Sequence, residues 1–101
     1  MKANEISKNV KLFYEKYPFL FSNIKSKIDL YNQASTFAKL LEKSIPLKKY
    51  ILDLGCGTGQ LAALLSIKKR YIIGIDFSKT SIRYANKLKK KLNFMVKMHY
   101  I

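Results

Sequence analysis

Two aspartates and a group of glycines are spaced in this sequence in a way that suits ligand binding. The first aspartate and the glycines lie together in Asp53-Leu54-Gly55-Cys56-Gly57-Thr58-Gly59, and the second aspartate, Asp76, follows 21 residues after Gly55. Glycines permit positive φ angles and let a ligand approach the main chain, because no Cβ stands in the way. A carboxylate about 20 residues after such a loop can accept hydrogen bonds from both hydroxyls of a ribose. The pattern therefore predicts a site for a ligand that contains a nucleoside.

The spacing of the glycines separates this loop from two common nucleotide-binding loops. A dinucleotide site has the pattern G-x-G-x-x-G, and here Gln60 stands where the third glycine would be. A phosphate-binding P-loop needs the pattern G-K-[ST], which the sequence lacks. The actual pattern, G-x-G-x-G, disfavours a pyrophosphate ligand, although a variant dinucleotide site stays open.

Hydrophobic patterning places this loop between a strand and a helix. Residues 50–54 and 71–76 are short apolar runs, which favours two buried parallel strands. Helical spacing follows each run, from Gln60 to about Lys69 and from Ser78, a good N-cap, to about Leu92. A third strand is expected in residues 93–101. This alternation predicts an α/β fold with a parallel sheet in the strand order 3-2-1, and a ligand site beyond the carboxyl ends of the strands.

The segment before the first strand is predicted to be helical. An apolar stripe from Ile6 to Tyr17 indicates a first helix. A second helix is expected from Asp29 to Ser44, with Phe37 on its inward side. The expected organisation is an N-terminal helical segment at 1–47, made of two helices, and a sheet domain at 48–101.

The composition of the 101 residues bounds the class of protein. Twenty Lys or Arg against six Asp or Glu give a formal net charge of +14, and 49% of the residues are hydrophobic. This is enough apolar material for one domain with a core, and too much for a disordered tail. A single cysteine and a single histidine exclude a disulfide framework and the usual metal sites with several Cys or His ligands. Because no apolar run approaches the roughly 20 residues of a membrane span, a cytoplasmic protein is expected.

Basic residues gather on one side of the last predicted helix. Its apolar side is formed by Ile82, Ala85, Leu88 and Leu92, and its opposite side by Lys79, Arg83, Lys87 and Lys91. Such a face can bind a polyanion such as RNA or can simply be solvated. Only two of the basic residues in the chain are arginines, the type that nucleic-acid readers favour, so RNA is a weakly supported partner at this point.

The loop and the second aspartate together resemble two motifs of the class I S-adenosylmethionine-dependent methyltransferases. Residues 51–59 resemble motif I of that family, and residues 73–78 resemble its next motif, which carries an acidic ribose ligand. The resemblance implies a Rossmann-like fold of three layers, with S-adenosyl-L-methionine as the cofactor. It also implies transfer of a methyl group to an acceptor, which could be a small molecule, RNA or protein.

The family's cofactor-binding positions can be carried over to this sequence. They fall on Asp53, Gly55, Cys56, Gly57, Thr58, Gly59, Asp76 and Phe77. The resemblance implies that the glycine turn lies beside the methionine and ribose parts of the cofactor. It further implies that the first aspartate lies near the methionine ammonium, that the second takes the ribose hydroxyls, and that the phenylalanine flanks the adenine.

Each of these residues also has a purely structural interpretation. Asp53 could tie the loop to the next helix, and Thr58 could cap that helix. Cys56 is expected to be a small loop residue and not a nucleophile, because no base is identifiable near it. Asp76 could be an ordinary turn residue at the end of a strand.

The resemblance covers less than the family's whole domain. The family has a larger sheet, and the sequence supplies only its first three strands and no assignable catalytic residue. One edge of the first strand would stay unpaired, which invites association. The chain is therefore expected to be the cofactor-binding N-terminal part of a methyltransferase, with a C-terminal half or a second copy as candidate partners. The alternatives are a non-enzymatic module that binds RNA or a partner protein, and an inactive truncated fragment.

Overall fold

The fold is an α/β arrangement built on one small parallel sheet. The computed structural model describes residues 3–16, 24–94 and 96–100. In chain order the elements are α1 (Ala3–Lys16), α3 (Lys27–Gln33), α4 (Thr36–Ser44), β1 (Tyr50–Leu54), α5 (Gln60–Leu65), β2 (Tyr71–Asp76), α6 (Lys79–Leu92) and β3 (Lys97–Tyr100). The strands are parallel and follow the order β1-β2-β3, which is the predicted order 3-2-1 counted from the other edge. The predicted fold class is confirmed.

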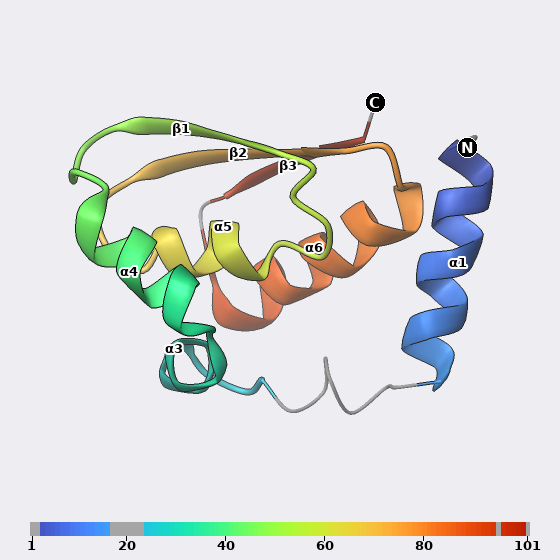
Figure 1. The fold of residues 1–101 in the computed structure, drawn as a ribbon, viewed down its shortest axis with the longest axis horizontal. Helices are drawn as coiled ribbons and strands as arrows, with labels where there is room; N and C mark the ends of the chain where they lie inside the picture. Colours follow the sequence, from blue (N-terminus) through green and yellow to red (C-terminus); the bar gives the residue numbers. More distant parts are fainter. Residues whose placement is uncertain (1–2, 17–23, 95, 101) are drawn as a thin grey trace.

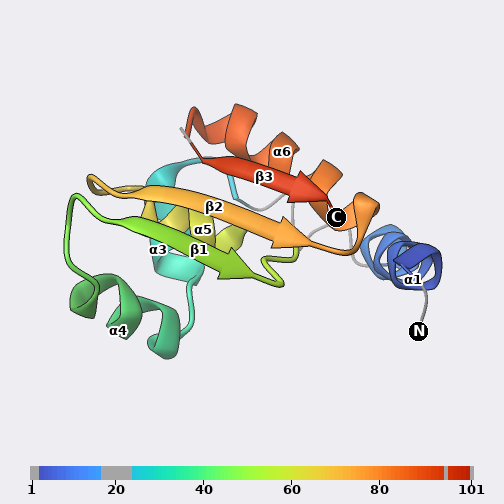
Figure 2. The ribbon, with the colours of Figure 1, turned by 90° about the horizontal axis from the view of Figure 1, so that it is seen from above.

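The helices of the two crossovers lie on the same face of the sheet (Figure 1). Both crossovers are expected to be right-handed, and a right-handed turn repeated in the same direction places α5 and α6 on one side. Seen from above, the opposite face is uncovered (Figure 2). Two of the expected three layers are thus present in the part of the chain that the structure describes.

Strand β1 is exposed on this uncovered face. Its side chains alternate between exposed and half-buried, with Tyr50, Leu52 and Leu54 exposed by 82%, 57% and 72%. The prediction of a fully buried strand is therefore wrong for β1. An uninterrupted apolar run does not show that both faces of its strand are covered, and here the described helices cover only one.

The core lies between the covered face of the sheet and helices α5 and α6. Its largest fully buried apolar side chains are Leu64, Ile72, Leu88 and Val96. The inward side predicted for α6 is buried throughout, and the basic stripe on its other side is exposed. The period of 3.6 residues in the sequence therefore predicted the orientation of α6 correctly.

The helix predicted from Asp29 to Ser44 is in fact two helices. Ala34 is extended at the end of α3, and Ser35 begins α4 by accepting a hydrogen bond on its side chain from the N–H of Ala38 at 3.1 Å. A serine cap of this kind starts a new helix, and the inward-facing side of that helix need not continue the inward-facing side of the helix before it. Phe37, which was predicted to face inward, is consequently 70% exposed.

Two further boundaries differ from the prediction. Helix α5 ends at Leu65 and not near Lys69, because the hydroxyl of Ser66 donates a hydrogen bond to the Ala63 carbonyl at 2.9 Å and closes the last turn. Strand β3 covers Lys97–Tyr100 and does not begin at residue 93, because Asn93 takes up the left-handed conformation that ends α6.

Helix α1 packs beside α6 rather than against the sheet (Figure 1). Ile6 and Val10, two residues of its predicted apolar stripe, are half-buried. Tyr17, at the end of that stripe, lies outside the described residues. Among the helices that the structure describes, none combines the length and the apolarity that crossing a membrane requires.

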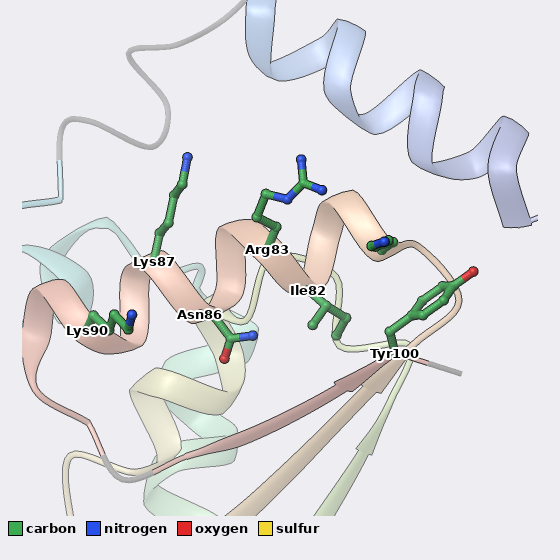
Figure 3. Close-up of a pocket in the computed structure, with 7 residues that line it drawn as sticks. Ile82, Arg83, Asn86, Lys87, Lys90 and Tyr100 are labelled. Atoms are coloured by element: carbon green, nitrogen blue, oxygen red, sulfur yellow. The ribbon is translucent and has the colours of Figure 1, made fainter.

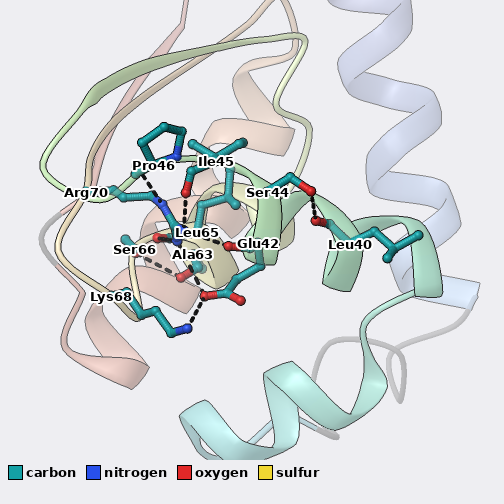
Figure 4. Close-up of polar contacts among 10 residues, drawn as sticks. All are labelled: Leu40, Glu42, Ser44, Ile45, Pro46, Ala63, Leu65, Ser66, Lys68 and Arg70. Carbon is teal, nitrogen blue, oxygen red and sulfur yellow. Dashed lines mark hydrogen bonds and ion pairs between the residues drawn. The ribbon is translucent and has the colours of Figure 1, made fainter.

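A buried arginine joins α4 to the turn before β2 (Figure 4). The guanidinium of Arg70 donates hydrogen bonds to the main-chain carbonyls of Leu65 at 3.0 Å, Glu42 at 2.6 Å and Ile45 at 2.7 Å. The Glu42 carboxylate lies 3.5 Å from this guanidinium and 3.3 Å from Nζ of Lys68. Arg70 therefore connects the N-terminal helices to the sheet.

Candidate functional site

The glycine loop turns the chain over the end of β2. The main-chain N–H groups of Gly55 and Cys56 both donate to the Ile75 carbonyl, at 2.7 and 3.0 Å. Gly55, Gly57 and Gly59 have φ angles of +71°, +58° and +80°. These values lie in the left-handed region, which side chains rarely adopt. The conformation of the loop therefore depends on the G-x-G-x-G pattern.

The three glycines differ in what surrounds them. A Cβ added to Gly55 or Gly57 would meet no atom within 4 Å, so a ligand can reach the main chain at both positions. A Cβ added to Gly59 would lie 2.9 Å from Cε of Met98 and 3.0 Å from Cβ of Ala85. The first two glycines thus leave space for a ligand, and the third lets the loop pack on α6 and β3.

Asp76 ends β2 and fixes the loop to it. Its Oδ2 accepts a hydrogen bond from the N–H of Gly57 at 2.9 Å, and its Oδ1 accepts one from the N–H of Ser78 at 2.8 Å. Ser78 in turn caps α6 as predicted, by accepting a hydrogen bond from the N–H of Ser81 at 3.1 Å. Each carboxylate oxygen has a second lone pair. Asp76 is therefore a turn residue that can still accept two hydrogen bonds from a ligand.

Asp53, one residue before the end of β1, lies in a different environment. No N–H group in the described part of the chain donates a hydrogen bond to it, and the N-cap of α5, Gly59, provides no side-chain cap. Partial burial, with the nearby Asp76 carboxylate as a second cause, raises the pKa of Asp53 above its ordinary value. Among the described residues, Asp53 is thus a carboxylate without a compensating cation near the end of the strand.

Cys56 and Thr58 are turned toward the protein. Burial, followed by the charges of the two site aspartates, raises the pKa of the Cys56 thiol to about 11. The thiol is therefore protonated at neutral pH, which agrees with the expectation that Cys56 is not a nucleophile. Thr58 is buried and its hydroxyl donates a hydrogen bond to the side-chain oxygen of Gln60, while the N-cap of α5 is the next residue, Gly59.

Two residues beneath the loop were not predicted. A Cβ added to Gly74 would lie 2.7 Å from Sδ of Met98 and 2.9 Å from Sγ of Cys56, so both sulfurs pack directly on the main chain of β2. A glycine inside an apolar strand is typical of such a close approach, and this was the available signal for Gly74. Nothing in the sequence pattern marked Met98.

A hollow of about 240 Å³ opens beside the loop. It is lined by Leu54, Gly55, Ile75, Asp76 and Phe77. Phe77 is 62% exposed, so much of its side chain is open to solvent at this hollow. The site therefore combines an accessible main chain, a hydrogen-bonding carboxylate and an exposed aromatic side chain at the carboxyl ends of β1 and β2, where open α/β sheets bind ligands.

Comparison with known families agrees with this arrangement. A family model described as a methyltransferase domain matches residues 47–100, a range that contains the glycine loop and both site aspartates. The chain belongs to this methyltransferase-domain family, and membership implies a cofactor of the S-adenosylmethionine type.

Individual relatives are larger proteins. The putative methyltransferase YqeM of Bacillus subtilis is 32% identical over 65 residues, which are 64% of this chain and 26% of that protein. The PH0226 protein of Pyrococcus horikoshii has a TM-score of 0.65 and 25% identity, over 88% of this chain and 38% of that one. TehB of Haemophilus influenzae has a TM-score of 0.60 and 28% identity, over 67% and 23%. The chain thus spans about a quarter of the length of the curated relative that it matches.

Proposed function

We propose that residues 50–77 bind S-adenosyl-L-methionine and that the chain is the cofactor-binding part of a methyltransferase. The observation that carries the proposal is the carboxylate of Asp76, which bridges the N–H groups of Gly57 and Ser78. This bridge keeps two acceptor oxygens beside a stretch of main chain that no Cβ covers. The methyltransferase family match over the same residues supports it.

Each part of the cofactor would meet a different group of the site. Asp76 accepts the two ribose hydroxyls, using one free lone pair on each oxygen. Phe77 offers an apolar side chain to the adenine. Asp53 faces the methionine ammonium, and this cation favours the charged carboxylate that burial and repulsion from Asp76 now disfavour. Gly55 lets the ligand approach the main chain.

When it is bound, the cofactor supplies an electrophilic methyl group. The described residues of this chain bind that group's carrier and orient it, which is the main way in which a protein promotes a direct transfer, together with exclusion of water. The protonated thiol of Cys56 takes no part as a nucleophile. The whole protein's methyl acceptor could be a small molecule, RNA or another protein.

Calorimetric titration with S-adenosylhomocysteine tests the proposal. Wild-type protein is expected to bind, and Asp76→Ala should weaken binding at least about 10-fold, because a hydrogen bond to a charged group contributes about 1.5–3 kcal/mol. Asp29→Ala is the matched control, since it removes a carboxylate that also accepts a main-chain hydrogen bond, on α3 and away from the carboxyl ends of the strands (Figure 1). This control should bind as the wild type does.

A second variant separates binding from loop structure. Asp76→Ala also removes the two hydrogen bonds that fix the loop, whereas Phe77→Ala leaves both in place and removes only the proposed adenine contact. Phe77→Ala should therefore fold normally by circular dichroism and bind S-adenosylhomocysteine more weakly. Undiminished binding by both variants, or no binding by folded wild-type protein, would contradict the proposal.

A further inference from the structure

A second, larger hollow runs along α6 beside the end of β3 (Figure 3). Its volume is about 440 Å³, and it is lined by Lys79, Ile82, Arg83, Asn86, Lys87, Lys90 and Tyr100. We call this hollow the basic groove. The described residues of its lining include cationic side chains from successive turns of α6 and no acidic side chain. Such a concave, positively charged surface favours an anionic ligand.

Little in the described part of the chain compensates the charge of the basic groove. Helix α6 contains no acidic residue. The described part of the chain places no carboxylate within ion-pairing distance of Lys79, Arg83 or Lys90. Of the acidic residues, Glu42 is engaged by Arg70, Asp29 accepts a hydrogen bond on α3, and Asp53 and Asp76 belong to the candidate cofactor site. Glu5 lies on α1, which packs beside α6, and among the described residues it makes no ion pair with these cations. These cations are therefore available to an anionic ligand.

The spacing of the cations suits a chain of phosphates better than a single anion. Lys79, Arg83 and Lys87 follow one another at intervals of four residues. Because an α-helix rises about 1.5 Å per residue, successive cations are displaced by about 6 Å along the helix axis. This displacement is comparable to the distance between neighbouring phosphates in an extended nucleic-acid strand. The row thus matches a polymer with regularly repeated negative charge.

The remaining lining residues favour a nucleic acid over other polyanions. Tyr100 is 45% exposed at one end of the groove, where its ring can stack on a base, and the Asn86 side chain carries both donors and acceptors for base edges. Modules for single strands combine a basic groove with such aromatic rings. We propose that the basic groove binds single-stranded RNA, with phosphates along α6 and a base against Tyr100.

The groove also adjoins the candidate cofactor site. Tyr100 is the register partner of Asp76 across the β2–β3 pair, so one end of the groove lies at the carboxyl ends of the same strands. The proposal requires only the groove, and it does not depend on methyl transfer by this protein.

Fluorescence anisotropy with a labelled single-stranded RNA of mixed sequence and the 101-residue chain tests this. Arg83→Gln combined with Lys87→Gln should weaken binding at least about 10-fold, and should reduce the slope of log K against log salt by about 1.4, because each phosphate contact to a single strand contributes about 0.7. The matched control, Lys43→Gln with Lys69→Gln, removes the same charge at exposed positions outside the groove and should change binding less than about 3-fold.

A third variant tests the base contact. Tyr100→Leu should weaken RNA binding and leave the salt slope unchanged, because it removes a stacking surface and no charge. Equal losses in the groove and control variants would show attraction to net charge alone, and would overturn the proposal. So would displacement of the RNA by poly-glutamate or by anionic vesicles at the same charge concentration. Titration of the groove variant with S-adenosylhomocysteine should give wild-type affinity, which separates a failure here from a failure of the proposed function.

Discussion

Two aspartates in one small site have opposite surroundings. Asp76 accepts hydrogen bonds from two main-chain N–H groups, and these hold its carboxylate in place. Asp53 has no such donors among the described residues, and burial together with the charge of Asp76 raises its pKa. Under the proposed function, the ribose hydroxyls of S-adenosylmethionine would meet the carboxylate of Asp76, and its ammonium group would meet that of Asp53.

The chain's single cysteine reports on this electrostatic environment. Alkylation of Cys56 by iodoacetamide should be slow at pH 8 and should accelerate about 10-fold per pH unit up to a pKa of about 11, because only the thiolate reacts. Asp53→Asn should shift this profile to lower pH only in part, since burial is the larger cause and remains. The measurement is the alkylation rate against pH, with a short cysteine peptide as the control. A profile that matches the peptide's would contradict the prediction.

At the scale of helices and strands, the sequence correctly predicted those features that are determined by neighbouring residues. The glycine loop and the cap at Ser78 depend on nearby residues, and both lie where they were expected. The division between α3 and α4 depends on Ser35, a single cap inside an otherwise helical pattern, and so the prediction joined the two helices. The exposure of β1 depends on what covers the other face of the sheet, which an apolar run does not reveal.

The hydrogen-bond network of Arg70 could not have been predicted from local sequence patterns. Its partners at Glu42 and Ile45 are separated from it by more than 20 residues, and most of them are main-chain carbonyls, which have no signature in the sequence. A buried arginine is stable only when such acceptors surround it. The single hint was an arginine in a chain whose basic residues are almost all lysines.

Removing this arginine should uncouple α4 from the sheet. Arg70→Met leaves the Glu42 carboxylate and several carbonyls without their buried partner, and should lower the free energy of unfolding by about 3–5 kcal/mol. The control Lys68→Met removes the other ion-pair partner of Glu42. Because the Lys68 side chain is 57% exposed, this change should lower the free energy of unfolding by less than about 1 kcal/mol. Urea denaturation followed by circular dichroism measures both. Similar losses for the two variants would show that the buried network contributes little.

The molecule as a whole combines a large positive net charge with an exposed apolar surface on the open face of the sheet. The net charge of +14 repels a second copy. The exposed side chains on the open face of the sheet, Tyr50, Leu52, Leu54 and Tyr71, favour contact. Charge repulsion acts over about 30 Å at 0.01 M salt but only about 3 Å at 1 M, whereas burial of apolar surface is not screened. The balance between the two therefore depends on ionic strength.

This balance predicts that association increases with salt. In sedimentation experiments the protein should be monomeric at 0.01 M salt and should associate at 1 M, because screening removes the repulsion while the open face remains. Leu52→Thr with Leu54→Thr should suppress association, whereas the control Ile28→Thr with Leu40→Thr, which changes equally apolar exposed positions on α3 and α4, should still associate. Association that is strongest at low salt, or that the β1 substitutions leave unchanged, would show that the open sheet face is not the contact surface. Suppression by the β1 pair alone would assign self-association to this face.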